Sequence, residues 1–401
     1  MIIGNKKKQG IVIVLLIHLF ICLFFGTITT VGASADKENA QANAEEKLNE
    51  SILEQINALD LAGLEKYINS LDLSSDKSLA QRLVEYIKGD GLDYENFGKQ
   101  IVRILFEKVR EILPAFACIT AITLLSGLIS TLKSGSNAHT SGEMIFLISY
   151  ASALIPVIAV LTECFSLTKR TVFEMQTQMQ LVFPLMLTLI SACGGSVTVS
   201  VCRPAVAYFS TAIVTVVASV VLPLTVAIIA FSMAGNLTKE LKISKFTAFF
   251  KSINKWIIGI CISAFGIFFT LQGITTATYD GIVRRTAKYA IGNGIPIVGG
   301  FLSGGFDLAV AGSVLIKNSL GSLSIFLMIS ILFEPLILLI AVNLLLRFTS
   351  AITQPFGDSR ISDFLSETAE NLRYCTASLL FTAFMYFLSI MLLVTSTEAL
   401  L

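Results

Sequence analysis

Four charged side chains in this sequence fall within or at the edge of long apolar runs. They are Arg203, Asp307, Lys317 and Glu334. A charge at the centre of a bilayer costs at least ~2.5–3.5 kcal/mol, so a charged group there usually faces a protein interior, a cavity or another charge. These four residues are therefore the first candidates for functional side chains inside a membrane.

Glu334 has long apolar flanks on both sides, and Pro335 next to it removes a helix hydrogen bond. A protonated Glu334 bonded to the freed carbonyl would be a structural feature. An ionisable Glu334 would instead line a pore or relay protons, and Arg203 would then meet an anionic substrate. For Lys317 the sequence favours a side chain that extends to the lipid headgroups.

Two apolar runs, Phe183–Ser210 and Ile295–Leu320, share the order of a proline, a glycine pair and a basic residue. Corresponding interruptions in two halves of a chain are typical of inverted-repeat transporters, whose broken helices meet near the bilayer midplane. Small residues that let helices approach closely explain the glycines equally well. The candidate glycines are Gly194, Gly195, Gly304 and Gly305.

The composition places these runs in a membrane. Of the 401 residues, 54% are hydrophobic and 14% are charged, and the mean hydropathy is +0.77, whereas soluble domains are about one-quarter charged. The net charge is +1 and the basic residues form no stripe, so we expect a lipid bilayer and no nucleic acid as partner. The predicted fold class is all-α: a polytopic helical membrane protein with two glycine-broken membrane segments.

The N-terminal part of the chain differs from the rest. Residues 1–35 combine a lysine cluster, an apolar block and Ala33-Ser34-Ala35, which predicts a signal peptide; an uncleaved first membrane helix is the alternative. Residues 36–111 are rich in charge and repeat leucine and isoleucine at three- and four-residue steps. They are expected to form a small helical extracytoplasmic region.

Residues 112–401 are expected to form a polytopic transmembrane domain of about seven spans, two of them interrupted or re-entrant. Their orientation depends on the run Phe183–Ser210. If this run re-enters without crossing, the lysine-rich segment 239–255 falls in the cytoplasm, as the positive-inside bias prefers. If the run crosses fully, the same segment falls outside.

Few residues suit catalysis or metal binding. The chain has two histidines and seven cysteines, and no cysteine pair has C-x-x-C spacing. Zinc-protease, hydrolase and P-loop motifs are absent. Asp280 and Asp307 match the paired aspartates of an intramembrane protease only in part, because the second glycine of G-x-G-D is missing. We therefore predict no catalytic residues, no cofactor and no metal.

Two long stretches carry a resemblance to a known family: FPLMLTLISACGGSVTVSVCRPAVAYFS and PIVGGFLSGGFDLAVAGSVLIKNSLG. With the signal peptide and the short helical region before the membrane part, the chain resembles the stage III sporulation protein AE family of endospore-forming Firmicutes over essentially its whole length. The resemblance implies a multi-pass protein of the mother-cell membrane around the forespore, and it supplies no catalytic residues.

The resemblance also implies partners: the other stage III A sporulation proteins and, directly or through the complex, the forespore stage II sporulation protein Q. That assembly looks like a specialised secretion or feeding conduit needed for late forespore gene expression. Two alternatives stay open. One is a stand-alone proton-coupled secondary transporter that uses Glu334 and Arg203. The other is an intramembrane protease that uses Asp280 and Asp307.

Overall fold

The structure is a computed structural model of the whole chain. It describes residues 50–70, 78–88, 94–132, 138–193, 208–209, 211–237, 243–294, 299–355 and 359–395, and within these ranges it contains helices and no strand. The all-α fold class is thereby confirmed. The predicted signal peptide, residues 1–35, lies outside the described residues.

The elements are mostly very long helices. After a helical segment at 50–58 come α3 Ala62–Ser70, α4 Leu79–Lys88, α5 Tyr94–Leu132, α6 Ala138–Ala192, the short π-helix η1 Val217–Val221, α8 Leu222–Leu237, α9 Ser244–Gly294, α10 Gly299–Thr353 and α11 Ser359–Thr395. At ~1.5 Å per residue, α6 and α10, with 55 residues each, are roughly 80 Å long. The hydrocarbon layer is ~30 Å thick, so these helices extend well beyond it.

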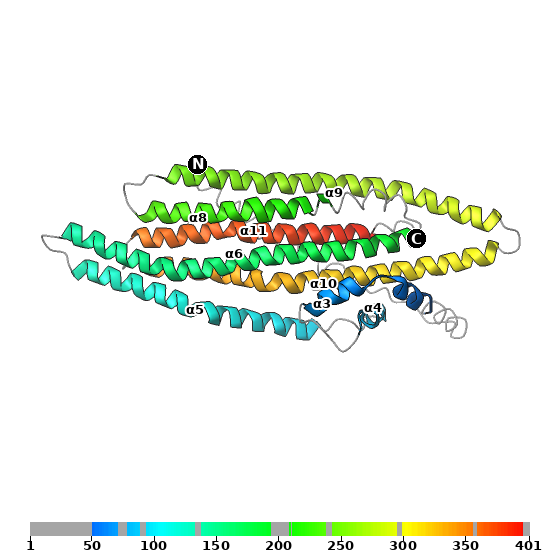
Figure 1. Cartoon of the computed structure of the whole chain (residues 1–401), viewed down its shortest axis with the longest axis horizontal. Helices are drawn as coiled ribbons and strands as arrows, with labels where there is room; N and C mark the ends of the chain where they lie inside the picture. The colour runs from blue at the N-terminus through cyan, green and yellow to red at the C-terminus, as the bar shows by residue number, and fades with distance from the viewer. Residues whose placement is uncertain are drawn as a thin grey trace.

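Figure 1 shows the long helices side by side in an elongated bundle. One end of the bundle holds the last turns of α5, α8 and α10 and the first turns of α6, α9 and α11. Side-chain contacts agree, since Arg360 at the start of α11 pairs with Glu143 at the start of α6 at 3.4 Å.

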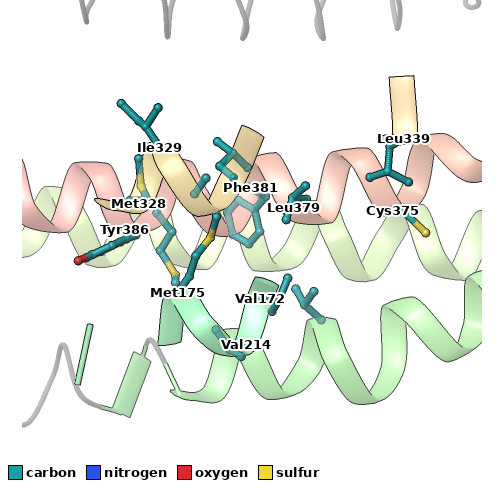
Figure 2. Packing of buried hydrophobic residues seen from close by; sticks show 14 of the residues in the cluster. Val172, Met175, Val214, Met328, Ile329, Leu339, Cys375, Leu379, Phe381 and Tyr386 are labelled. Carbon is teal, nitrogen blue, oxygen red and sulfur yellow. The ribbon is translucent and has the colours of Figure 1, made fainter. Parts of the chain in front are cut away.

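Helix α11 forms the centre of the bundle and packs against α10, α6 and α8. Figure 2 shows Met175 of α6, Met328 of α10 and Phe381 of α11 in one buried cluster. Close approach requires Gly321 of α10, because a Cβ there would come within 2.5 Å of Val394 on α11. Helix association inside a bilayer depends on this kind of tight packing, since lipid tails are as apolar as the side chains.

In the part of the chain that the structure describes, six helices are long and apolar enough to cross a membrane. They are Val102–Ile129, Glu143–Ala192, Thr211–Leu237, Ser244–Leu271, Val310–Thr353 and Ser359–Thr395. The sequence suggested about seven because it separated Ile295–Leu320 from the apolar stretch that follows. From Gly299 onward both belong to α10, so the described parts of the two predicted segments are one helix.

The glycine pair of the second apolar run does not interrupt a helix. Gly304 and Gly305 lie inside α10, which continues from Gly299 through Pro335 to Thr353. A glycine inside a helix costs only about 1 kcal/mol relative to alanine. Breaking the helix in an apolar setting would leave backbone groups without partners, at several kcal/mol each. The first glycine pair, Gly194 and Gly195, follows the end of α6 and lies outside the described residues.

The N-terminal helices pack on the bundle. The Ser313 hydroxyl on α10 donates to Oε1 of Gln55 at 2.6 Å, and the Tyr67 hydroxyl on α3 donates to the Glu174 carbonyl on α6 at 3.2 Å. Burial, and secondarily the charge of Glu174, raises the pKa of Tyr67 well above its usual value. These helices therefore cover one side of α6 and α10 at this level of the bundle.

Candidate functional site

Glu334 lies in a group of charges that joins three helices. Its Oε1 is 3.1 Å from Nζ of Lys108 on α5. The same ammonium is 3.3 Å from Glu111 on α5 and 4.0 Å from Glu163 on α6. We call Lys108, Glu111, Glu163 and Glu334 the charged node.

The helices position the charged node by their register. Lys108 and Glu111 are three residues apart on α5 and so lie on one face, and both precede the apolar part of that helix. Glu163 follows the apolar part of α6, which runs back alongside α5. Because these two helices form a hairpin, the residues that bound their apolar stretches meet at the same level. Glu334 reaches this level from α10.

The charged node is open to its surroundings, since the Glu334 side chain is 46% exposed and that of Lys108 is 19% exposed. Ion pairs this exposed are worth about 0–1 kcal/mol. One ammonium faces three carboxylates, so Lys108 offsets repulsion among them as well as pairing with each. The sequence left open a neutral Glu334 bonded to a carbonyl freed by Pro335; in the structure the described partner of the Glu334 carboxyl group is the ammonium of Lys108.

Lys317 corrects another expectation. Its side chain is fully buried, so it does not extend to the lipid headgroups. Nζ donates to the carbonyl of Val394 in the last turn of α11 at 2.5 Å. The last carbonyls of a helix have no partner within the helix and carry partial negative charge, and a cation there satisfies both needs. Lys317 thus caps the central helix.

The remaining predicted residues are placed only in part. Asp307 lies in α10 and Asp280 in α9, and neither side chain is among those described. Arg203 lies outside the described residues. Of the candidates whose side chains are described, Glu334 pairs with Lys108 and Lys317 binds the end of α11, and the two do not contact each other.

Several polar groups that the sequence did not single out lie inside the bundle. Gln178 of α6 is fully buried and its Nε2 donates to the Ser324 carbonyl of α10 at 2.9 Å. Asn254 of α9 and Asn371 of α11 are also fully buried, and each has side-chain amide atoms without a partner among the described residues. Such residues can be recognised in a sequence as polar residues inside an apolar helix pattern. Asn371 was not recognised in this way, because the wider polar stretch around it resembled a loop.

The described part of the chain contains no cluster of metal ligands and no disulfide bond. No group of three or more histidine, cysteine or acidic side chains there could hold a metal ion. Five cysteines are described, and none of them forms a disulfide bond: Cys118, Cys164, Cys193, Cys261 and Cys375.

Comparison with known proteins gives one consistent result. The family model described as stage III sporulation protein AE matches residues 78–397. Stage III sporulation protein AE of Bacillus subtilis (strain 168) is 23% identical over 315 residues, which are 78% of this chain and 79% of that protein. No solved structure matches this chain.

Proposed function

The chain belongs to the stage III sporulation protein AE family, and we propose that it is a non-enzymatic membrane subunit of the stage III sporulation complex. This complex is a transport or secretion-like assembly that links mother cell and forespore and is required for late forespore gene expression. The observation that carries the proposal is the family match over residues 78–397. The six membrane-length helices support a multi-pass subunit.

A structural role for the candidate side chains supports the non-enzymatic assignment. Lys108 and Glu334 tie α5 to α10, and Lys317 caps α11. In each case the charged side chain makes a contact between two helices. The partners we propose are the other stage III A proteins and, directly or through the complex, stage II sporulation protein Q of the forespore.

The distribution of basic residues supports an orientation. Lys245, Lys251 and Lys255 lie in the first turns of α9, and Arg360 lies in the first turn of α11. The positive-inside bias favours the cytoplasm for this end of the bundle. The N-terminal helices pack on the other halves of α6 and α10, so they would face the space between the mother-cell and forespore membranes.

Gene deletion in the organism that encodes this chain tests the proposal. We expect engulfment to finish normally and late forespore transcription, measured with a fluorescent reporter, to fail. Expression of the intact chain in the mother cell should restore the reporter, whereas expression in the forespore should not. Normal spore yield from the deletion strain would refute the proposed function.

A further inference from the structure

A cavity of about 170 Å³ lies where α8 ends and α9 begins, against the side of α11. Its polar lining comes from three helices: Ser232 and Asn236 of α8, Ser244, Thr247 and Lys251 of α9, and Glu367 of α11. We call this space the α8–α9 cavity. It belongs to neither the charged node nor the cap at Lys317.

One wall of the α8–α9 cavity is negatively charged. The buried Ser232 hydroxyl donates to Oε2 of Glu367, and the Asn236 side-chain amide donates to the same oxygen at 3.3 Å. These two bonds hold the carboxylate in place at the cavity wall. A held carboxylate can receive a cationic group without first reorganising.

Another part of the cavity lining is positively charged. Lys251 lines the cavity, and its backbone carbonyl accepts a hydrogen bond from Tyr374 of α11 at 3.5 Å. Helix α9 begins at Ser244, which also lines the cavity. The first N–H groups of a helix have no partner within the helix and carry partial positive charge. This wall therefore suits an anionic group.

Deeper in the bundle, two fully buried amides lie on the same helix faces as the charged residues of the cavity. Asn371 follows Glu367 by one turn, and neither of its amide atoms has a partner among the described residues. Asn254 follows Lys251 by three residues; its Nδ2 donates to Thr225 at 2.9 Å, whereas its Oδ1 has no described partner. A buried unpaired polar group is costly, but neither amide is among the residues that line the cavity, so the proposed site does not include them.

We propose that the α8–α9 cavity binds a small zwitterion of the α-amino acid class, with its ammonium on Glu367 and its carboxylate on Lys251 and the start of α9. A simple cation would leave Lys251 uncompensated, and a simple anion would leave Glu367 uncompensated. Pockets for drug-sized ligands measure ~300–1,000 Å³, so a cavity of about 170 Å³ restricts the solute to a small one.

Equilibrium binding of radiolabelled alanine to the purified full-length protein in lipid nanodiscs tests the site. We expect saturable binding that unlabelled glycine or serine displaces, and no displacement by putrescine or succinate. Equal displacement by putrescine would show a cation site, and equal displacement by succinate would show an anion site. Either result, or the absence of saturable alanine binding to folded protein, overturns the proposal.

Two pairs of variants locate the binding. Glu367→Gln keeps an oxygen that can accept from Ser232 but removes the charge, and Lys251→Gln removes the opposing charge. Each should weaken alanine binding at least about tenfold, the factor that corresponds to about 1.4 kcal/mol. The matched controls Asp363→Asn and Lys255→Gln remove the same charges from exposed positions on the same two helices, and they should bind alanine normally.

Controls that weaken binding as much as the cavity variants would overturn the assignment to this cavity. Thermal unfolding of each purified protein identifies a variant that fails to fold. If Glu367→Gln fails to fold, Lys251→Gln decides, because it changes no described hydrogen bond of its side chain. The site is independent of the sporulation role, since it is measured on purified protein and the role is measured in sporulating cells.

Discussion

Glu334 shows how far a single residue can be interpreted from its neighbours in sequence. Its apolar surroundings marked it as unusual, and in the structure it has a specific partner. That partner, Lys108, lies far away in sequence, in a segment assigned to the region outside the membrane. Because hydropathy describes only the local chain, no sequence pattern could have paired the two. Lys317 was misplaced for the same reason, since its acceptor belongs to the last turn of another helix.

The charged node gives a prediction at the residue scale. Lys108→Met leaves Glu111, Glu163 and Glu334 close together without the ammonium, so the free energy of unfolding should fall by about 1 kcal/mol. Glu334→Gln alone should have a smaller effect, because two carboxylates still pair with Lys108. In the double variant part of the loss should be recovered, and thermal unfolding in detergent measures this coupling.

The same variants separate the structural role of Glu334 from the proton-coupled transporter considered above. In sporulating cells, Glu334→Gln should keep forespore transcription near its normal level. Transcription that fails in Glu334→Gln at normal protein level, but persists in Lys108→Met, would restore the proton-coupling hypothesis.

Helix α10 is continuous although its sequence suggested a break. Its glycines and its proline suggested a broken segment, yet a single helix runs from Gly299 to Thr353. Glycine and proline lower helix propensity by amounts that tertiary packing and the need for backbone hydrogen bonds can exceed. The informative glycine is Gly321, which the sequence analysis did not select, because its role depends on the approach of α11.

Gly321 gives the prediction for helix packing. Gly321→Ala places a Cβ within 2.5 Å of a methyl group of Val394, and the stiff, β-branched valine cannot move aside without shifting α11. We expect the free energy of unfolding to fall by about 1–3 kcal/mol. Gly266→Ala on α9, where an added Cβ meets nothing within 4 Å, is the matched control. Equal stability of the two variants in detergent would contradict the tight α10–α11 approach.

For the whole molecule, composition was sufficient to predict an all-α membrane protein. It did not determine where one helix ends and the next begins, because two apolar stretches separated by polar or small residues can belong to one long helix. The structure places the ends of α5, α8 and α10 together. Hydropathy cannot reveal this relation, since it depends on the three-dimensional path between spans.

Cysteine accessibility tests the orientation of the whole molecule. In protoplasts, a membrane-impermeant maleimide should label Glu54→Cys in the N-terminal helices from outside. Lys245→Cys at the start of α9 and Ser359→Cys at the start of α11 should react only after the membrane is permeabilised. The unchanged protein provides the background from its own thiols. External labelling of the two bundle-end positions would reverse the proposed orientation.

The place of α11 at the centre of the bundle has a consequence for biosynthesis. The ribosome makes α11 after the five other described membrane helices, so α6, α8, α9 and α10 leave the insertion machinery before this shared partner exists. Until then Phe183 of α6, whose ring lies 5.9 Å from that of Tyr386 of α11 between centroids, must be covered by lipid or a chaperone. Premature termination before α11 should therefore yield a chain that inserts but is rapidly degraded.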